Sequence, residues 1–224
     1  GEGDFDGVIA GRITSNGQAL AGIKVSLSSR NSATIGLIGE ALSDADGHYH
    51  FGGLTAGTYT LWFSDPAEIY ATSYYSNAST SATGSEVWID QGEQLTNLDA
   101  ELQLAGAVSG RVVLRNIDAP DNFVVRLWFV TQESPFLAEM SQNGTLDSDG
   151  AYRVAALPPG TYRACVYELQ LGWVPHICYG NPFGLSYVYG ATDISVRAGV
   201  TTPNINMFLG DSYPHSAFLP MLAK

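Results

Sequence analysis

The fold of this chain is decided by a stretch that occurs twice, SDADGHYHFGGLTAGTY over residues 43–59 and LDSDGAYRVAALPPGTY over residues 146–162. The two copies keep a constant offset of 103 residues from their first glycine to their last. No residue is gained or lost within the stretch, so we interpret it as one structural element used twice.

The repeated stretch predicts a turn, a strand, a second turn and a second strand. Asp-x-Asp-Gly suits a tight turn, because aspartate side chains bond nearby backbone amides and glycine tolerates a positive φ. Apolar and polar residues alternate after each turn, as they do in a half-buried strand. The residues expected on the inner face of the second strand are Tyr59, Leu61 and Phe63 in one copy and Tyr162, Ala164 and Val166 in the other.

Length and composition predict an all-β protein with two domains. A chain of 224 residues accommodates two repeats of about 100 residues each. No segment carries apolar residues at helical spacing without glycine or β-branched interruptions. The expected parts are an N-terminal segment at 1–6, a first β-sandwich at 7–105, a second β-sandwich at 106–210 and an apolar C-terminal tail at 211–224.

The flanking sequence supplies the remaining strands. An Asn-Gly pair at 16–17 predicts a hairpin turn after the first strand, and the alternation over 23–27 predicts the inner face of the next one. Further strands are expected at 87–89, 97–102, 123–129, 194–196 and 204–209.

The charge of the chain narrows its function. There are 22 acidic residues against 10 basic ones, which disfavours nucleic-acid binding because phosphate contacts need clustered lysine and arginine. No run of about 18 apolar residues predicts a membrane span. The first residues also lack the basic and apolar regions of a signal peptide, as expected of a mature exported form.

The succession Gly-Arg-Ile/Val, Asp-x-Asp-Gly-x-Tyr-x-Phe/Val and Leu-x-x-Gly-Thr-Tyr resembles the carboxypeptidase regulatory-like family, which is related to the collagen-adhesin B-type repeats of bacterial surface proteins. The resemblance covers residues 8–104 and 107–210. It implies that each repeat is a seven-stranded, transthyretin-like (Ig-like) β-sandwich in an extracellular tandem array. It implies no single function, because such modules serve as stalks, spacers, adhesin segments and enzyme appendages.

The only cysteines, Cys165 and Cys178, are expected to form a disulfide. Cys165 lies on the face of its strand opposite to the core, and Cys178 falls in the crossing that follows. The alternatives are a metal pair or a nucleophile, and neither has partner residues in the sequence. Aligned on the repeat, Trp62 and Tyr74 hold the same positions in the first copy, so an aromatic contact is expected there instead. Closing so short a loop contributes roughly 3 kcal/mol.

Metal binding and catalysis find no support in the sequence. We interpret the acidic pairs of the repeated stretch as turns, because a calcium loop of the EF-hand type needs a further ligand after the glycine and a glutamate at its end. The four histidines form no metal constellation. No nucleophile elbow, phosphate loop or His-Glu-x-x-His motif is present. We predict no metal site, no cofactor and no enzymatic activity.

The resemblance also raises a lysine–asparagine cross-link of the kind found in adhesin repeats, with Lys24 and Asn97 as the pair. Alternation argues against it. Ile23 and Val25 are expected to face inward, so Lys24 faces solvent.

Aromatic residues raise the question of glycan binding. The chain contains 4 tryptophans and 12 tyrosines. Such rings stack on sugars, but they equally pack across strands in β-sandwiches. The best single place for a ligand is the loop 169–175, with Leu171 and Trp173 as candidate contacts.

The tail at 211–224 resembles the short Leu-Pro-containing C-terminal tails of some bacterial exported surface proteins. Its apolar residues, Phe218, Leu219, Met221 and Leu222, are expected to be anchors in an assembly interface.

The leading hypothesis is an extracellular structural protein, a subunit of a cell-surface filament or lattice that forms a homopolymer with other copies of itself. Terminal segments are expected to pack on neighbouring β-sandwiches or to complement them with a strand. The alternative is a monomeric adhesin or carbohydrate-binding tandem module.

Overall fold

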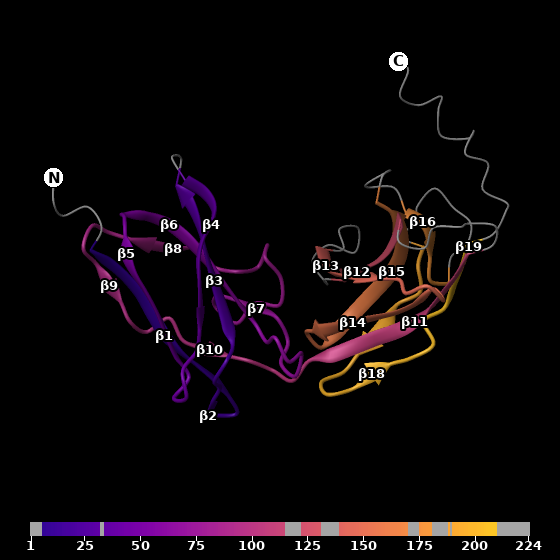
Figure 1. Cartoon of the computed structure of the whole chain (residues 1–224), viewed down its shortest axis with the longest axis horizontal. Helices are drawn as coiled ribbons and strands as arrows, with labels where there is room; N and C mark the ends of the chain where they lie inside the picture. The colour runs from indigo at the N-terminus through magenta and orange to yellow at the C-terminus, as the bar shows by residue number, and fades with distance from the viewer. Residues whose placement is uncertain are drawn as a thin grey trace, which may run out of the picture. The chain divides into compact units, whose positions relative to one another are not determined.

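The computed structural model describes residues 6–31, 34–114, 122–130, 139–169, 175–180, 188 and 190–209 (Figure 1). Every regular element among these residues is a β-strand, which confirms the all-β fold class.

The first repeat contains ten strands, four of which have only two residues. They are β1 (Gly7–Ser15), β2 (Gln18–Ala19), β3 (Lys24–Asn31), β4 (Thr34–Leu42), β5 (His48–Leu54), β6 (Gly57–Ser64), β7 (Ser73–Tyr74), β8 (Val87–Ile89), β9 (Gln94–Leu95) and β10 (Ala100–Glu101).

The second repeat follows the same order along the chain. Its described strands are β11 (Gly106–Leu114), β12 (Phe123–Phe129), β13 (Glu139–Thr145), β14 (Ala151–Leu157), β15 (Gly160–Glu168), β16 (Pro175–Cys178), β17 (Ile194–Val196), β18 (Thr201–Thr202) and β19 (Met207–Leu209).

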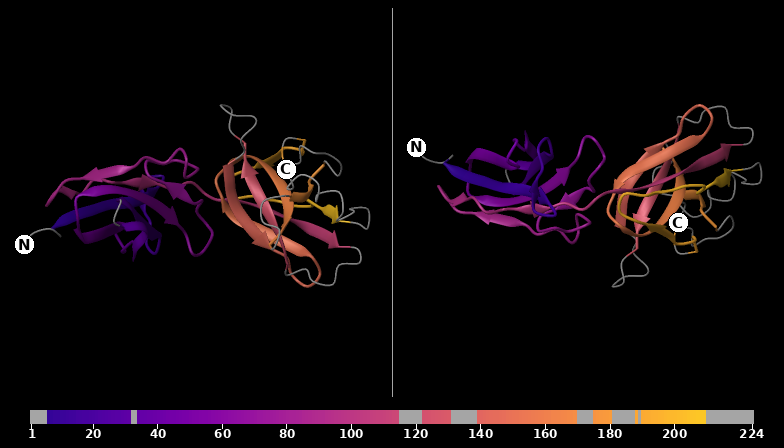
Figure 2. Two further views of the ribbon diagram at one scale, coloured as in Figure 1. Left: turned by 90° about the horizontal axis from the view of Figure 1, so that it is seen from above. Right: turned by 90° about the horizontal axis from the view of Figure 1, so that it is seen from below.

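Each repeat is built from two sheets. In the first repeat, one sheet centres on β1, which pairs with β2, β5, β9 and β10, and the other runs β4-β3-β6-β7 with β8 also on β6. The second repeat reproduces this plan with β11 at the centre of one sheet and β13-β12-β15-β16, joined by β17, as the other. Figure 2 shows the strands of each repeat layered in this way.

The two sheets of the first repeat enclose one hydrophobic core. Ile9 and Ile13 of β1 meet Val25 and Leu27 of β3, and all four side chains are fully buried. The inner face predicted for β6 is confirmed by the burial of Tyr59, Leu61 and Phe63, and the same face of β15 by the burial of Tyr162, Ala164 and Val166.

The turns form as the sequence predicts. Gly47 and Gly150 have φ values of 82° and 75°, a region that glycine adopts without a steric penalty. Asn16 and Gly17 both have positive φ, as a two-residue hairpin turn requires.

Two of the expected strands are much shorter in the structure. The alternation over 97–102 yields only the pair of residues in β10, and the alternation over 204–209 yields β19. Both segments keep their inward side chains buried, including Leu98, Leu102 and Ile205. The pattern therefore reported burial correctly, whereas ladder pairing is limited to a few residues.

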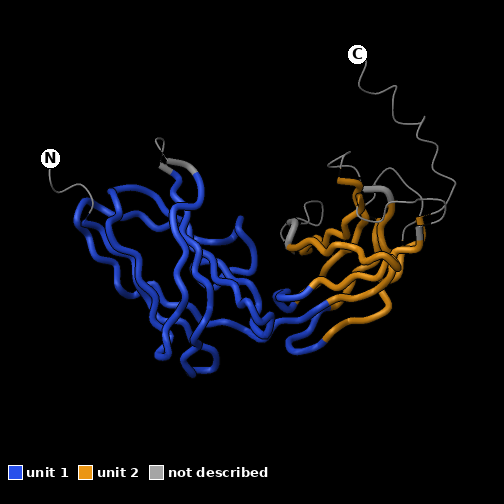
Figure 3. Tube along the Cα trace, in the orientation of Figure 1, with its two compact units in different colours: residues 1–107, 155–159, 196–200 blue, residues 108–154, 160–195, 201–224 orange. Residues whose placement is uncertain are grey.

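The chain divides into two compact units (Figure 3). Unit 1 comprises residues 1–107, 155–159 and 196–200, and unit 2 comprises the remainder. Two short segments of the second repeat thus group with unit 1. The boundary that the sequence places between residues 105 and 106 stays a prediction.

Candidate functional site

The disulfide predicted from the sequence is present on the second repeat. Cys165 of β15 lies directly opposite Cys178 of β16, with their Cα atoms 4.0 Å apart. The exposed fractions of the two residues are 0% and 1%. The bridge is therefore sealed from solvent and is a structural link.

The bridge belongs to a second hydrophobic cluster, on the outer face of the sheet. Val124, Tyr167 and Ala191 are buried against the cystine, and Trp128 and Val188 pack on its margin. Strand β15 is consequently buried on both faces, because its inner face already lines the core.

Arg163 ties the covering segment down. Its Nε donates to Oδ1 of Asp193 at 2.7 Å, and its Nη1 donates to the carbonyl of Val188 at 3.2 Å. Only 16% of the Arg163 side chain is exposed, so this ion pair is shielded from salt more than an open surface pair. The sequence analysis missed Arg163, because its partners lie 25 and 30 positions further along the chain.

Electrostatics in this cluster keep Tyr167 neutral. The guanidinium of Arg126 lies 4.5 Å from the centre of the Tyr167 ring. Burial raises the pKa of Tyr167 to about 12, against smaller lowering effects from Trp128 and Arg126. The phenol stays protonated at neutral pH and acts as packing rather than as an acid or a base.

The same positions of the first repeat hold an aromatic pair, as predicted. Trp62 of β6 lies opposite Tyr74 of β7 in the register that Cys165 and Cys178 occupy in the second repeat. Both aromatic residues are half-buried, as are Thr60 and Ser64 on β6. This outer face is therefore more open than its counterpart on β15.

The acidic turns use their carboxylates internally. Oδ1 of Asp44 accepts the backbone N–H groups of Asp46 and His48 at 2.9 and 2.8 Å, and Oδ1 of Asp147 accepts the equivalent pair in the second repeat. The N–H of His48 is the largest cause that lowers the pKa of Asp44, with burial opposing it. Among the described residues, no three His, Cys, Asp or Glu side chains gather as metal ligands.

Each turn is also held by an arginine that the sequence analysis did not single out. Nε of Arg12 donates to the carbonyl of Asp46 at 2.9 Å, and Nη1 of Arg111 donates to that of Asp149 at 2.6 Å. The signal was available, because a Gly-Arg pair opens both repeats.

A buried tyrosine closes each sandwich in the same way. The hydroxyl of Tyr49 donates to the carbonyl of Leu98, and that of Tyr152 to the carbonyl of Ile205, both at 2.6 Å. Burial is the main cause that raises the pKa of both tyrosines above the ordinary value.

Lys24 faces solvent, as its place in the alternation predicts. Its Nζ lies 3.2 Å from Oε1 of Glu40, and 41% of the side chain is exposed. The hydrogen bond from Lys24 is the first cause that lowers the pKa of Glu40. The amine is thus paired with Glu40 rather than with Asn97, the partner considered for a cross-link.

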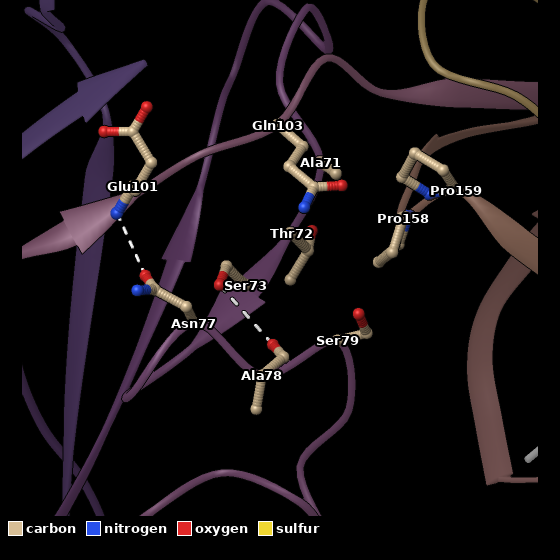
Figure 4. A pocket seen from close by; sticks show the side chains of 10 residues that line it. All are labelled: Ala71, Thr72, Ser73, Asn77, Ala78, Ser79, Glu101, Gln103, Pro158 and Pro159. Atoms are coloured by element: carbon tan, nitrogen blue, oxygen red, sulfur yellow. Dashed lines mark hydrogen bonds between the residues drawn. The ribbon is translucent and has the colours of Figure 1, made fainter. Parts of the chain in front are cut away.

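Unit 1 has a small hollow beside β7 (Figure 4). Segments 71–73 and 77–79 form part of its wall, where Oδ1 of Asn77 accepts the N–H of Glu101 at 2.9 Å. Its volume of about 40 Å³ is room for a water molecule rather than for an organic ligand.

The sequence was then compared with known protein families. Residues 8–103 match the model of the carboxypeptidase regulatory-like domain. The first repeat is a carboxypeptidase regulatory-like domain. Its acidic turn, its arginine tether and its buried tyrosine all recur in the second repeat. The assignment of residues 107–210 to the same domain type stays a prediction, which these shared contacts support.

Solved structures resemble the chain in fold only. The minor pilin GBS52 of Streptococcus agalactiae is 14% identical with a TM-score of 0.33, and the match covers 87% of this chain and 86% of that one. A streptococcal ancillary pilin is 17% identical with a TM-score of 0.34, covering 91% and 62%. The Bacillus anthracis TIE protein is 12% identical with a TM-score of 0.36, covering 92% of this chain but 34% of its own. This chain thus spans about a third of the last protein, and the search of curated proteins found no match.

The remaining candidate residues lie outside the described part of the chain. They are Leu171, Trp173, Phe218, Leu219, Met221 and Leu222. Their roles as a ligand loop and as assembly anchors stay predictions. Beside the carboxypeptidase regulatory-like domain and its repeat, the described residues contain no helix long and apolar enough to cross a membrane.

Proposed function

We propose that this protein is an extracellular structural protein, a subunit of a cell-surface filament or lattice. The observation that carries the proposal is the buried disulfide of the second repeat, which holds β15 to β16 beneath a covering segment. Disulfides form and persist in oxidising compartments and are rare in the cytosol. A sealed bridge with no chemistry around it suits a load-bearing module outside the cell.

The geometry also favours an architectural role over a chemical one. In both repeats, the polar groups of the acidic turns are bonded within the turn or to an arginine of the same sandwich. The hollow beside β7 is too small for an organic substrate. We therefore propose that the protein has no enzymatic activity.

Assembly is proposed to run through terminal segments that pack on a neighbouring β-sandwich or add a strand to it. Sandwich sheets end in strands with unpaired backbone groups, which accept such additions. Repeated head-to-tail contacts of this kind build an open polymer.

Deletion of residues 211–224 tests this proposal. Filaments seen by negative-stain microscopy for the full chain are expected to disappear, while the circular dichroism spectrum of the two sandwiches is retained. Deletion of residues 1–6 is the matched control for the other end. Filaments of normal length after removal of residues 211–224 would exclude a role for the tail.

A monomeric glycan-binding tandem is the second candidate, and Trp88 favours it. The residue is 61% exposed, and its Nε1 donates to Oδ1 of Asp90 at 3.1 Å, which fixes the ring on the surface. Light scattering separates the two candidates, because a monodisperse particle near the chain mass of 23.9 kDa supports the monomeric module.

A further inference from the structure

The strand β4 is an open edge of the first repeat. It is the terminal strand of the sheet β4-β3-β6-β7, and β3 is its only partner among the strand pairings that the structure describes (Figure 1). With nine residues it is one of the longest strands of the repeat. A long strand in this position presents a row of backbone N–H and C=O groups to another chain.

Large apolar side chains line this edge. Leu37, Ile38 and Leu42 are 55%, 40% and 64% exposed. The pairing of β4 with β3 shifts at this point, since Leu27 faces Gly39 and Ser28 faces Leu37. Ile38 is therefore the extra residue of a bulge, and two adjacent apolar side chains lie open to solvent.

The second repeat shows that the fold does not require this apolar edge. Strand β13 holds the same place at the end of the sheet β13-β12-β15-β16. Its sequence, EMSQNGT, is polar at most positions, whereas that of β4, TIGLIGEAL, is mostly apolar. Natural edge strands avoid association by means of charged and polar residues. That protection is largely absent from β4.

Charge indicates what covers the edge. The chain has a net charge of −12, so two copies repel each other over most of their surfaces. Glu40 is the only charged residue of β4, and Lys24 on β3 neutralises it at 3.2 Å. This edge is therefore a place where a second acidic copy approaches without local repulsion.

We propose that β4 pairs with β4 of a second copy of this chain, so that the two sheets join edge to edge in a symmetric dimer. Two-fold symmetry makes the paired strands antiparallel. A register centred on Ala41 places Leu42 opposite Glu40 of the second copy and keeps the two Glu40 carboxylates from facing each other. The dimer contact is independent of the terminal segments.

Sedimentation velocity of the full chain between about 1 and about 100 μM tests the dimer. The fraction of particles at twice 23.9 kDa is expected to rise with concentration. The double variant Ile38→Lys/Leu42→Lys is expected to weaken dimerisation by about tenfold or more, because pairing would then desolvate two charges at the edge. Phe208→Lys is the matched control, since Phe208 is an apolar side chain on β19 with 67% exposure, and it is expected to dimerise normally.

Hydrogen exchange of the full chain reads the backbone directly. Amides of β4 are expected to exchange more slowly at high concentration, and those of β13 to be unchanged. A full chain that stays monomeric, an edge variant that still dimerises with a native circular dichroism spectrum, or equal loss in the Phe208→Lys control would overturn the proposal. Filaments are scored separately by microscopy, so failure of the terminal-segment proposal does not alter this result.

Discussion

At the scale of single residues, Gly47 shows why the acidic turn tolerates no side chain. Its φ is +82°, and a Cβ atom there would lie 2.5 Å from the carbonyl oxygen of Ile13. Gly17 has a similar φ of +75°, but no atom lies within 4 Å of its Cβ position. The two glycines therefore separate backbone strain from steric conflict.

Gly47→Ala is expected to destabilise the first repeat by more than about 2 kcal/mol, because strain and collision add. Gly17→Ala is expected to lose only about 1 kcal/mol, the cost of placing alanine in the left-handed region. Urea denaturation followed by tryptophan fluorescence measures both values. Equal losses for the two variants would show that the contact with Ile13 is relieved at little cost.

At the scale of elements, the two sheets that carry the disulfide and the aromatic pair share one plan. Residues 165 and 178 are linked covalently, whereas Trp62 and Tyr74 meet only through side-chain packing. The covalent form restricts the unfolded chain, while packing acts only in the folded state.

Replacing Cys165 and Cys178 with alanine is expected to lower the stability of the second repeat by about 3 kcal/mol. The native bridge is also expected to resist dithiothreitol until the sandwich unfolds, because both residues are buried. Thiol titration with and without denaturant measures this protection, and denaturation curves measure the loss. Rapid reduction of the native protein would contradict the buried position of the bridge.

The strands differ in how far the sequence could predict them. Val87–Ile89 and Ile194–Val196 were predicted to the residue, because each is a short apolar triplet before a turn. Strand β4 was not predicted, since Gly36, Gly39 and the bulge at Ile38 interrupt its alternation.

The candidate site was predictable only in part. The cysteine pair follows from the repeat, because an element used twice fixes which positions face each other. The covering contacts of Arg163 depend on tertiary pairing with Val188 and Asp193, which no local pattern encodes.

At the scale of the whole molecule, both repeats depend on a buried tyrosine hydroxyl. Tyr49 and Tyr152 each donate to a carbonyl near the end of their repeat, and burial raises the pKa of both. A raised pKa in the folded state means that stability is complete below the ordinary tyrosine pKa of 10.0. It is lost as the pH rises from there toward the folded-state value.

Both repeats are therefore expected to lose stability above about pH 10. Denaturation midpoints measured across this range, together with the absorbance of tyrosinate, follow the effect. Tyr49→Phe is expected to lower stability at neutral pH and to remove part of the alkaline dependence. Midpoints that stay constant to pH 12 would contradict the linkage.

The disulfide has a further consequence for a molecule under tension. Cys165 and Cys178 are 13 positions apart, and a fully extended chain gains roughly 3.3–3.6 Å per residue. When the second repeat is pulled open from its ends, the bridge keeps this loop out of the extending chain. The repeat then lengthens by roughly 40 Å less than an unbridged chain of the same size, so each unfolding event yields a shorter extension.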